Sequence, residues 1–281
     1  MKPAPFTYHR PGTREEVDDL LLGLGGEAKI LAGGQSLVPI LNMRLADPAH
    51  VIDINHLRDE EAKPVVESGE VLFGPLVRQH TVESFPEAAR HLPLLVETIP
   101  FVAHPAIRSR GTVVGSVAHA DPAAELPAIA LALDARVHVR SSSGRRQVPA
   151  GDFFTGPLET ALSHDEWVEA VVFPVMEAGT GYAFEEFAQR RGDYALCGVA
   201  AVADEERVSL TFLGCSDVPR RIRLTSAGDG AKPLRQAVDE AVGQLEPEED
   251  IHATASYRRH LAVRLAVTAA ERALKRARGG T

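Results

Sequence analysis

Two short stretches of this chain combine small residues with hydrogen-bond donors in a way that suits phosphate binding. The first is Ala32-Gly33-Gly34-Gln35-Ser36, which directly follows the run Lys29-Ile30-Leu31. Two adjacent glycines allow the backbone to turn with positive φ and leave its N–H groups uncovered by any Cβ atom. The loop has one glycine pair and no lysine after it, so it fits neither the dinucleotide fingerprint with three spaced glycines nor the phosphate loop that ends in Gly-Lys.

The second stretch is Thr112-Val113-Val114-Gly115-Ser116. Its small residues follow an apolar approach, and the hydroxyls of Thr112 and Ser116 add side-chain donors. Taken singly, each stretch is typical of a tight turn. Together, the two could hold the two phosphates of a dinucleotide from opposite sides, and we therefore expect them to meet in the folded chain.

Other kinds of chemistry have little support in the sequence. The only two cysteines, Cys197 and Cys215, lie in apolar stretches and form no metal or iron–sulfur motif. The eleven histidines show no spacing typical of a metal site, and no Gly-x-Ser-x-Gly motif indicates a hydrolase. We predict no metal site and no catalytic acid, base or nucleophile in this chain.

Composition narrows the class of protein further. A length of 281 residues with 44% hydrophobic and 25% charged residues is typical of a globular protein with about two domains. The net charge of −9 disfavours nucleic acid as a partner. The N-terminus has no apolar core of signal-peptide length, and no run of about 18 apolar residues indicates a transmembrane segment. The few cysteines and the lack of an export signal predict a cytoplasmic location.

The elements that must position these stretches can be read from hydrophobic periodicity. Thr13 and Glu16 form a capping box that begins a helix, and the strands expected at 28–31 and 50–54 enclose the first stretch in a β-α-β unit. A hairpin is expected at 64–74 and a broken helical region at 81–95. After the second stretch, Asp121 is expected to cap a helix at 122–133.

The last part of the chain reads as a separate domain. A strand at 169–173 is followed by Pro174 and Gly179, which mark a boundary. Three strands are then predicted at 182–189, 196–203 and 208–215. Apolar residues at helical spacing predict two final helices, one at 234–245 and one after Tyr257. A three-stranded sheet backed by helices would close such a domain.

Four blocks of sequence, in order along nearly the whole chain, resemble a known family: AGGQSLVPILNMRLADPAHVIDI, IRSRGTVVGSVAHADPAAELP, FFTGPLETAL and FAQRRGDYALCGVAA. They are similar to the FAD-binding medium subunit of the carbon monoxide dehydrogenase and xanthine dehydrogenase family of molybdenum hydroxylases. The resemblance implies an α+β fold of the type found in vanillyl-alcohol oxidase and p-cresol methylhydroxylase. It implies an FAD-binding domain at 1–177, with subdomains at about 1–56 and 57–177, and a C-terminal domain at 178–281.

The resemblance also implies a set of FAD contacts, in which the two glycine-containing stretches lie on the pyrophosphate. Glu125 would reach a hydroxyl of the ribityl or ribose part, Tyr194 would lie beside the flavin ring, and the backbone of Val168 would touch the isoalloxazine. From the residues alone, Glu125 could be a solvated helix carboxylate, and Tyr194 and Val168 could be core residues. The complete set is Lys29, Ile30, Leu31, Ala32, Gly33, Gly34, Gln35, Ser36, Thr112, Val113, Val114, Gly115, Ser116, Glu125, Val168 and Tyr194. The chain departs from the family at Val114, where a glycine is usual.

The function implied is that of an oxidoreductase component that binds FAD and transfers electrons. A large subunit with a molybdenum–pterin centre would oxidise the substrate, a small subunit with two [2Fe–2S] clusters would relay the electrons, and the resulting heterotrimer would dimerise. FAD would pass the electrons to an external acceptor. Two alternatives stay open: a stand-alone FAD-dependent oxidase or dehydrogenase, and a non-enzymatic module that has lost FAD, which Val114 makes conceivable.

Overall fold

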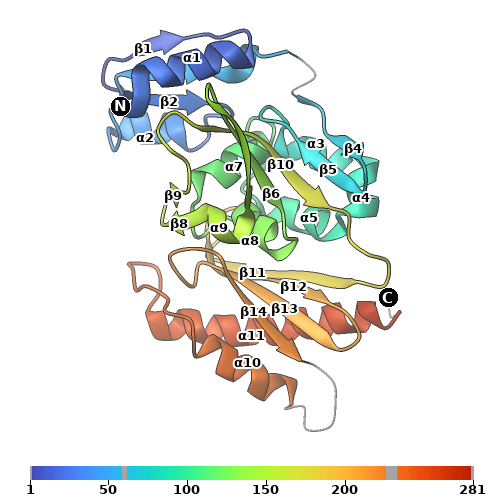
Figure 1. Cartoon of the computed structure of the whole chain (residues 1–281). Coiled ribbons are helices and arrows are strands. Elements are labelled where there is room, and N and C mark those ends of the chain that lie inside the picture. Colours follow the sequence, from blue (N-terminus) through green and yellow to red (C-terminus); the bar gives the residue numbers. More distant parts are fainter. Residues whose placement is uncertain (1, 59–61, 226–232, 280–281) are drawn as a thin grey trace.

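The computed structural model describes residues 2–58, 62–225 and 233–279. Three regions follow one another along the chain and in space (Figure 1). The N-terminal region contains β1 (Thr7–His9), α1 (Arg14–Leu24), β2 (Ala28–Leu31), α2 (Leu37–Met43) and β3 (His50–Asp53). Its strands pair in the order β1-β3-β2, and both pairings are parallel. The predicted β-α-β unit around the first stretch is therefore confirmed.

The start of α1 shows how the local sequence determines this region. Thr13 is the N-cap, and its hydroxyl oxygen accepts a hydrogen bond from the backbone N–H of Glu16 at 3.2 Å. The Glu16 carboxylate accepts from the backbone N–H of Gly12 at 2.6 Å, one residue earlier than in the standard capping box. Val17 and Leu21 on one face of the helix are buried, as the periodicity predicts.

The middle region is built on an antiparallel sheet in the order β4-β5-β10-β6-β7, with helices packed against it. Its strands are β4 (Val65–Glu67), β5 (Glu70–Phe73), β6 (Arg136–Ser141), β7 (Gly144–Pro149) and β10 (Trp167–Pro174), with a separate small pair, β8 (Phe154–Gly156) and β9 (Glu159–Thr160). Its helices are α3 (Gln79–Ser84), α4 (Pro86–His91), α5 (Pro93–Thr98), α6 (Pro105–Arg108), α7 (Val113–His119), α8 (Glu125–Ala132) and α9 (Ala150–Phe153).

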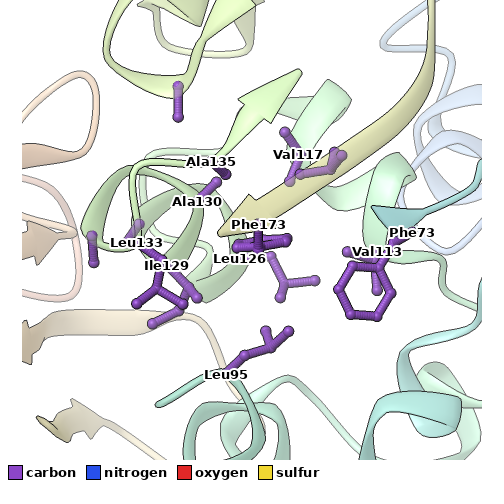
Figure 2. Packing of buried hydrophobic residues seen from close by; sticks show 14 of the residues in the cluster. Phe73, Leu95, Val113, Val117, Leu126, Ile129, Ala130, Leu133, Ala135 and Phe173 are labelled. Carbon is purple, nitrogen blue, oxygen red and sulfur yellow. The ribbon is translucent and has the colours of Figure 1, made fainter. Parts of the chain in front are cut away.

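The largest hydrophobic core lies in this middle region (Figure 2). Every residue of α8 is buried, which agrees with a helix that is apolar nearly all round. Figure 2 shows Leu126, Ile129 and Leu133 of this segment gathered with Leu95 and with Phe173 of β10. Because α7 begins in the same core, the second stretch is attached to a closely packed support.

The C-terminal region is a four-stranded antiparallel sheet with two helices (Figure 1). It contains β11 (Gly181–Ala188), β12 (Ala195–Ala203), β13 (Arg207–Leu213), β14 (Arg220–Thr225), α10 (Leu234–Val242) and α11 (Ala255–Ala277). The fold class is confirmed, but the expectation of three strands is corrected to four. The sequence of β14, RRIRLT, holds only two apolar residues and four polar ones, because an edge strand buries little side-chain surface. No helix among the described residues combines the length and apolarity needed to span a bilayer.

Both faces of this C-terminal sheet are covered. Along β12, Val199 and Ala201 join the core formed with α10 and α11, whereas Ala200 joins the core of the middle region. Glu97 of α5 connects the two regions electrostatically: its carboxylate accepts from the backbone N–H of Phe184 at 3.0 Å and from Arg276 of α11 at 2.7 Å. The near-continuous apolar character of β12 follows from burial on both sides.

A buried charged network joins the N-terminal region to the middle sheet. Asp18 of α1 is 5% exposed and accepts hydrogen bonds from Arg140 Nε at 2.7 Å and from Trp167 Nε1 at 2.8 Å. Arg140 lies in β6 and Trp167 begins β10, so one carboxylate contacts two neighbouring strands. Arg140 also donates to Glu15 at 2.7 Å, so removal of Asp18 would leave the Trp167 indole N–H without its acceptor and the guanidinium without its buried hydrogen-bonded carboxylate.

We expect Asp18→Ala to destabilise the protein by about 3–5 kcal/mol, because it leaves the Arg140 guanidinium and the Trp167 indole N–H without this acceptor. Urea denaturation followed by tryptophan fluorescence measures the change. The neighbouring Asp19 is exposed on the same helix, and Asp19→Ala serves as the control, with an expected effect within about 0.5 kcal/mol. Equal effects of the two substitutions would contradict the role given to Asp18.

Candidate functional site

The first glycine-containing stretch forms the loop between β2 and α2. Gly34 has φ +71°, a conformation that favours glycine, and Gln35 Nε2 donates to the carbonyl oxygen of Gly33 at 2.8 Å. The backbone N–H groups of Gly33, Gly34, Gln35 and Ser36 find no acceptor among the described residues, although the loop is partly buried. Since partly buried backbone donors are normally paired, this loop is suited to an anionic ligand with several acceptor oxygens.

The two stretches meet in the folded chain, as expected. A Cβ atom added at Gly33 would lie 2.6 Å from the carbonyl oxygen of Arg110 and 2.7 Å from Cα of Gly111. A Cβ atom at Gly115 would lie 3.9 Å from Cβ of Ala32. The backbone of the first loop therefore rests directly on the chain that leads into the second stretch, and only glycine fits at position 33.

Arg78 braces this meeting point from one side. Its Nη1 donates to the Arg110 carbonyl oxygen at 2.5 Å, and its Nη2 donates to Asn55 Oδ1 at 2.6 Å. Asn55 in turn donates through Nδ2 to the carbonyl oxygen of Ala32 at 2.7 Å. One guanidinium is thus connected directly to the chain that leads into the second stretch and, through Asn55, to the first stretch.

The second stretch is the beginning of helix α7 and not a free turn, which corrects the expectation from sequence. Thr112 is the N-cap and accepts from the backbone N–H of Gly115 at 2.9 Å through its hydroxyl and of Ser116 at 3.2 Å through its carbonyl. The N–H of Val113 donates to the carbonyl oxygen of Val77 at 3.0 Å. Small residues and a threonine suit a helix start as well as a turn, because both need an N-terminal cap.

These bonds leave the N–H of Val114 without an acceptor among the described residues. The Val114 side chain is 4% exposed and packs into the core of the middle region. The side chain at position 114 therefore points into the interior and does not occupy the space beside the first loop.

Tyr194 lies between β11 and β12, close to the first stretch and to Asp121. Tyr194 is 60% exposed. Its hydroxyl interacts with the side chains of Ser36 in the first loop and Asp121 after α7. Desolvation, together with the negative charges of Asp121 and Glu125, raises the pKa of this hydroxyl, so the phenol stays protonated at neutral pH. The structure thus brings Tyr194 to the first loop with an exposed ring.

Glu125, the first residue of α8, is buried and belongs to a cluster of acidic residues. Burial raises its pKa from 4.5 to about 7. Glu186 of β11 lies within electrostatic reach; burial and the charge of Glu125 raise its pKa to about 8. The Oε2 atom of Glu186 is buried and has no hydrogen-bond partner in the described part of the chain. These carboxyl groups could accept hydrogen bonds from the hydroxyls of a sugar-like ligand.

The other predicted site residues lie in β-strands. Val168 lies in β10 with its side chain 4% exposed in the main core, and its strand packs against α7. Lys29 has an exposed side chain on β2, an edge strand that pairs only with β3. Ile30 and Leu31, partly buried, carry the strand into the first loop.

Several residues of the site escaped the sequence analysis. Asn55 and Arg78 carry no motif, and their roles depend on contacts between distant segments. Asp121 was expected to cap the following helix, but α8 begins four residues later, after Ala124. Asp121 instead accepts from the backbone N–H of Ala123 at 2.9 Å. The Asp-Pro pair indicates a turn as readily as a helix cap, and that turn places Asp121 beside Tyr194.

Comparison with known proteins shows the family to which the chain belongs. The family described as the FAD binding domain in molybdopterin dehydrogenase matches residues 4–176, and the CO dehydrogenase flavoprotein C-terminal domain matches residues 182–273. The carbon monoxide dehydrogenase medium chain of Hydrogenophaga pseudoflava is 35% identical over 93% of this chain and 94% of its own length. The nicotine 6-hydroxylase medium subunit of Paenarthrobacter nicotinovorans is 39% identical over 93% of this chain and 94% of its own.

Solved structures show the same likeness. A chain of carbon monoxide dehydrogenase from Hydrogenophaga pseudoflava superposes with a TM-score of 0.92 at 33% identity, covering 98% of this chain and 99% of that one. A chain of quinoline 2-oxidoreductase from Pseudomonas putida 86 gives 0.92 at 31% identity and covers 99% of both. The family models and the fold thus define an FAD-binding flavoprotein. The chain belongs to the family of FAD-binding medium subunits of molybdopterin dehydrogenases, and it is an oxidoreductase component.

Substituting Gly33 tests the contact between the two stretches. We expect Gly33→Ala to weaken FAD binding at least about tenfold, or ~1.4 kcal/mol, because the new methyl group pushes the loop away from Arg110 and Gly111. Titration of the FAD-free protein with FAD, followed by flavin fluorescence, gives the affinity. Gly26→Ala is the matched control, because an added Cβ there meets nothing within 4 Å. Unchanged affinity in Gly33→Ala would contradict the close contact.

The buried carboxyls predict a pH dependence. Because the folded pKa values of Glu125 and Glu186, about 7 and about 8, exceed the ordinary value of 4.5, the unfolded chain releases these protons first. The stability of the FAD-free protein should therefore fall as pH rises from about 5 to about 8. Thermal unfolding across this range should show a clearly smaller slope in Glu125→Gln, whereas Glu205→Gln, at an exposed position, should keep the native slope. The same slope in all three proteins would contradict the burial of an ionisable Glu125.

Proposed function

We propose that this chain is the electron-transfer subunit of a molybdenum hydroxylase, which accepts electrons from iron–sulfur clusters and passes them to an external acceptor. The observation that carries the proposal is the row of unpaired N–H groups at 33–36, resting against Arg110 and Gly111. An uncharged donor array can hold a diphosphate without burying a lysine. This feature fits FAD, whose binding the family membership establishes.

The proposed FAD contacts divide by chemistry. The loop at 32–36 and the start of α7 at 112–116 would hold the pyrophosphate through backbone and hydroxyl donors, with Lys29, Ile30 and Leu31 leading into the first loop. Glu125 would accept a hydrogen bond from a ribityl or ribose hydroxyl, which suits a buried carboxyl group. Tyr194, with its exposed ring, would cover one face of the flavin, and the backbone of Val168 would touch the isoalloxazine.

No side chain of the chain is proposed as an acid, base or nucleophile. When bound, FAD supplies the redox chemistry, and the protein binds and orients it and shields it from water. The hydroxyl of Tyr194 remains protonated at neutral pH and interacts with Ser36 and Asp121, which helps to keep the ring in place. The contacts of Arg78 hold the two stretches together and so set the width of the phosphate site.

The partners proposed are a large molybdenum–pterin subunit and a small subunit with [2Fe–2S] clusters, in a heterotrimer that dimerises in the cytoplasm. Relatives are named as medium chains or medium subunits, names that place them in multi-subunit complexes. The chain itself has two cysteines, fewer than the four thiolates that one such cluster takes. We also propose the division into an FAD-binding domain at 1–177, with subdomains at about 1–56 and 57–177, and a C-terminal domain at 178–281.

Purified chain, alone and with its two partners, tests the proposal. We expect the chain alone to be yellow with bound FAD and to keep the spectrum of oxidised flavin when carbon monoxide, an aldehyde or an aromatic heterocycle is added anaerobically. With both partner subunits present, the correct substrate should bleach the flavin absorption. Bleaching in the chain alone would support a stand-alone oxidase or dehydrogenase instead, and a colourless protein after addition of FAD would support a module that has lost the cofactor.

A further inference from the structure

The two cysteines of the chain lie in contact inside the C-terminal region. Cys197 belongs to β12 and Cys215 follows β13, and their Sγ atoms are 3.1 Å apart. Both side chains are buried, with exposures of 0% and 1%. A disulfide bond is about 2.05 Å long, so a movement of about 1 Å would bring the two sulfur atoms to bonding distance.

Several contacts hold the two sulfur atoms side by side. Gly198 and Leu213 are paired in the antiparallel ladder of β12 and β13, and Gly214, with φ +70°, turns the chain just before Cys215. Buried Arg258 of α11 donates through Nη1 to the carbonyl oxygens of Leu196 at 2.6 Å and Gly214 at 3.1 Å. These carbonyls belong to the residues that precede the two cysteines, so one guanidinium fixes both chain segments at the thiol pair.

We propose that Cys197 and Cys215 form a reversible intrachain disulfide when the protein is exposed to a peroxide. One thiol is oxidised by hydrogen peroxide to a sulfenic acid, with release of one water molecule. The second thiol then attacks that sulfur, the S–S bond forms, and a second water molecule leaves. Two electrons pass from the two sulfurs to the peroxide, and both thiol protons end in water.

We expect the disulfide to form slowly, because both thiols are buried, and to persist once it has formed. The hydrogen bond with Cys215 and desolvation raise the pKa of the Cys197 thiol, so the reactive thiolate is scarce at neutral pH. The same fixed geometry favours the disulfide at equilibrium, because little conformational freedom remains to be lost when the bond forms. In a reducing compartment the pair remains a dithiol, and it closes under oxidising conditions.

The position of the pair gives the cross-link a structural consequence. β12 begins directly after Tyr194, and the N–H of Gly214 donates to the carbonyl oxygen of Pro122 at 2.8 Å, next to Asp121. A disulfide would therefore link the segment that follows Tyr194 to the segment that contacts Pro122. We therefore expect the oxidised protein to resist unfolding more strongly than the reduced one.

Prolonged treatment of the purified full-length chain with hydrogen peroxide tests the proposal, with thiol counting in denaturant and non-reducing peptide mapping as readouts. We expect the two free thiols to disappear, a peptide pair linked through Cys197 and Cys215 to appear, and dithiothreitol to restore both thiols. The melting temperature of the oxidised protein should rise by about 5 °C or more. None of these readouts depends on FAD or on activity, so the result stands apart from the proposed function.

Cys215→Ser provides the control for other effects of peroxide, including methionine oxidation, and its melting temperature should not rise on treatment. If this variant folds poorly, comparison of the oxidised and reduced native chain remains decisive because both have the same sequence. Two free thiols after treatment, oxidation of one cysteine to a sulfinic acid without cross-linking, or a disulfide between two molecules would each overturn the proposal.

Discussion

The contact of the Gly33 backbone with Arg110 and Gly111 is the constraint on which the candidate site depends. Backbone atoms of two distant segments approach so closely there that no side chain fits between them. The loop at 33–36 cannot bend back to satisfy its own N–H groups, because it is held between β2, α2 and the chain before α7. These donors find no acceptor within residues 2–58, 62–225 and 233–279, which is consistent with a ligand that supplies the missing acceptors.

Buried or half-buried arginines hold several irregular segments of this chain. Arg78 braces the two glycine-containing stretches, Arg258 holds the segments that carry the cysteines, and Arg108 donates to the carbonyl oxygens of Val102 and Ala103. Ala103 has φ +44°, an uncommon backbone conformation for a residue other than glycine. A guanidinium offers five donors in a rigid plane, so a single side chain can fix several carbonyl groups that no helix or sheet satisfies.

Backbone donors and carboxyl groups lie in different parts of the candidate site. Backbone donors that find no acceptor among the described residues lie in the first loop and at Val114, whereas the carboxyls of Glu125, at the start of α8, and Glu186 of β11 lie within electrostatic reach of each other. Burial raises the pKa of both carboxyls, which lowers the negative charge carried near a bound anion at neutral pH. The arrangement matches a ligand with phosphates at one part and hydroxyl groups at another.

Local sequence determined much of this protein: the Thr13 cap, the β-α-β unit around Gly33 and Gly34, and the apolar strands of the C-terminal region. These features depend on residues a few positions apart, and the family resemblance identified the cofactor. The edge strand β14, the helix that starts at Thr112, and the turn at Asp121 were missed or misassigned because their residues suit more than one local structure. Only the tertiary structure decided that Arg78 joins Asn55 to the chain before the second stretch, that Glu125 lies within electrostatic reach of Glu186, and that the two cysteines touch. These contacts join segments far apart along the chain, and packing of the shared core brings them together.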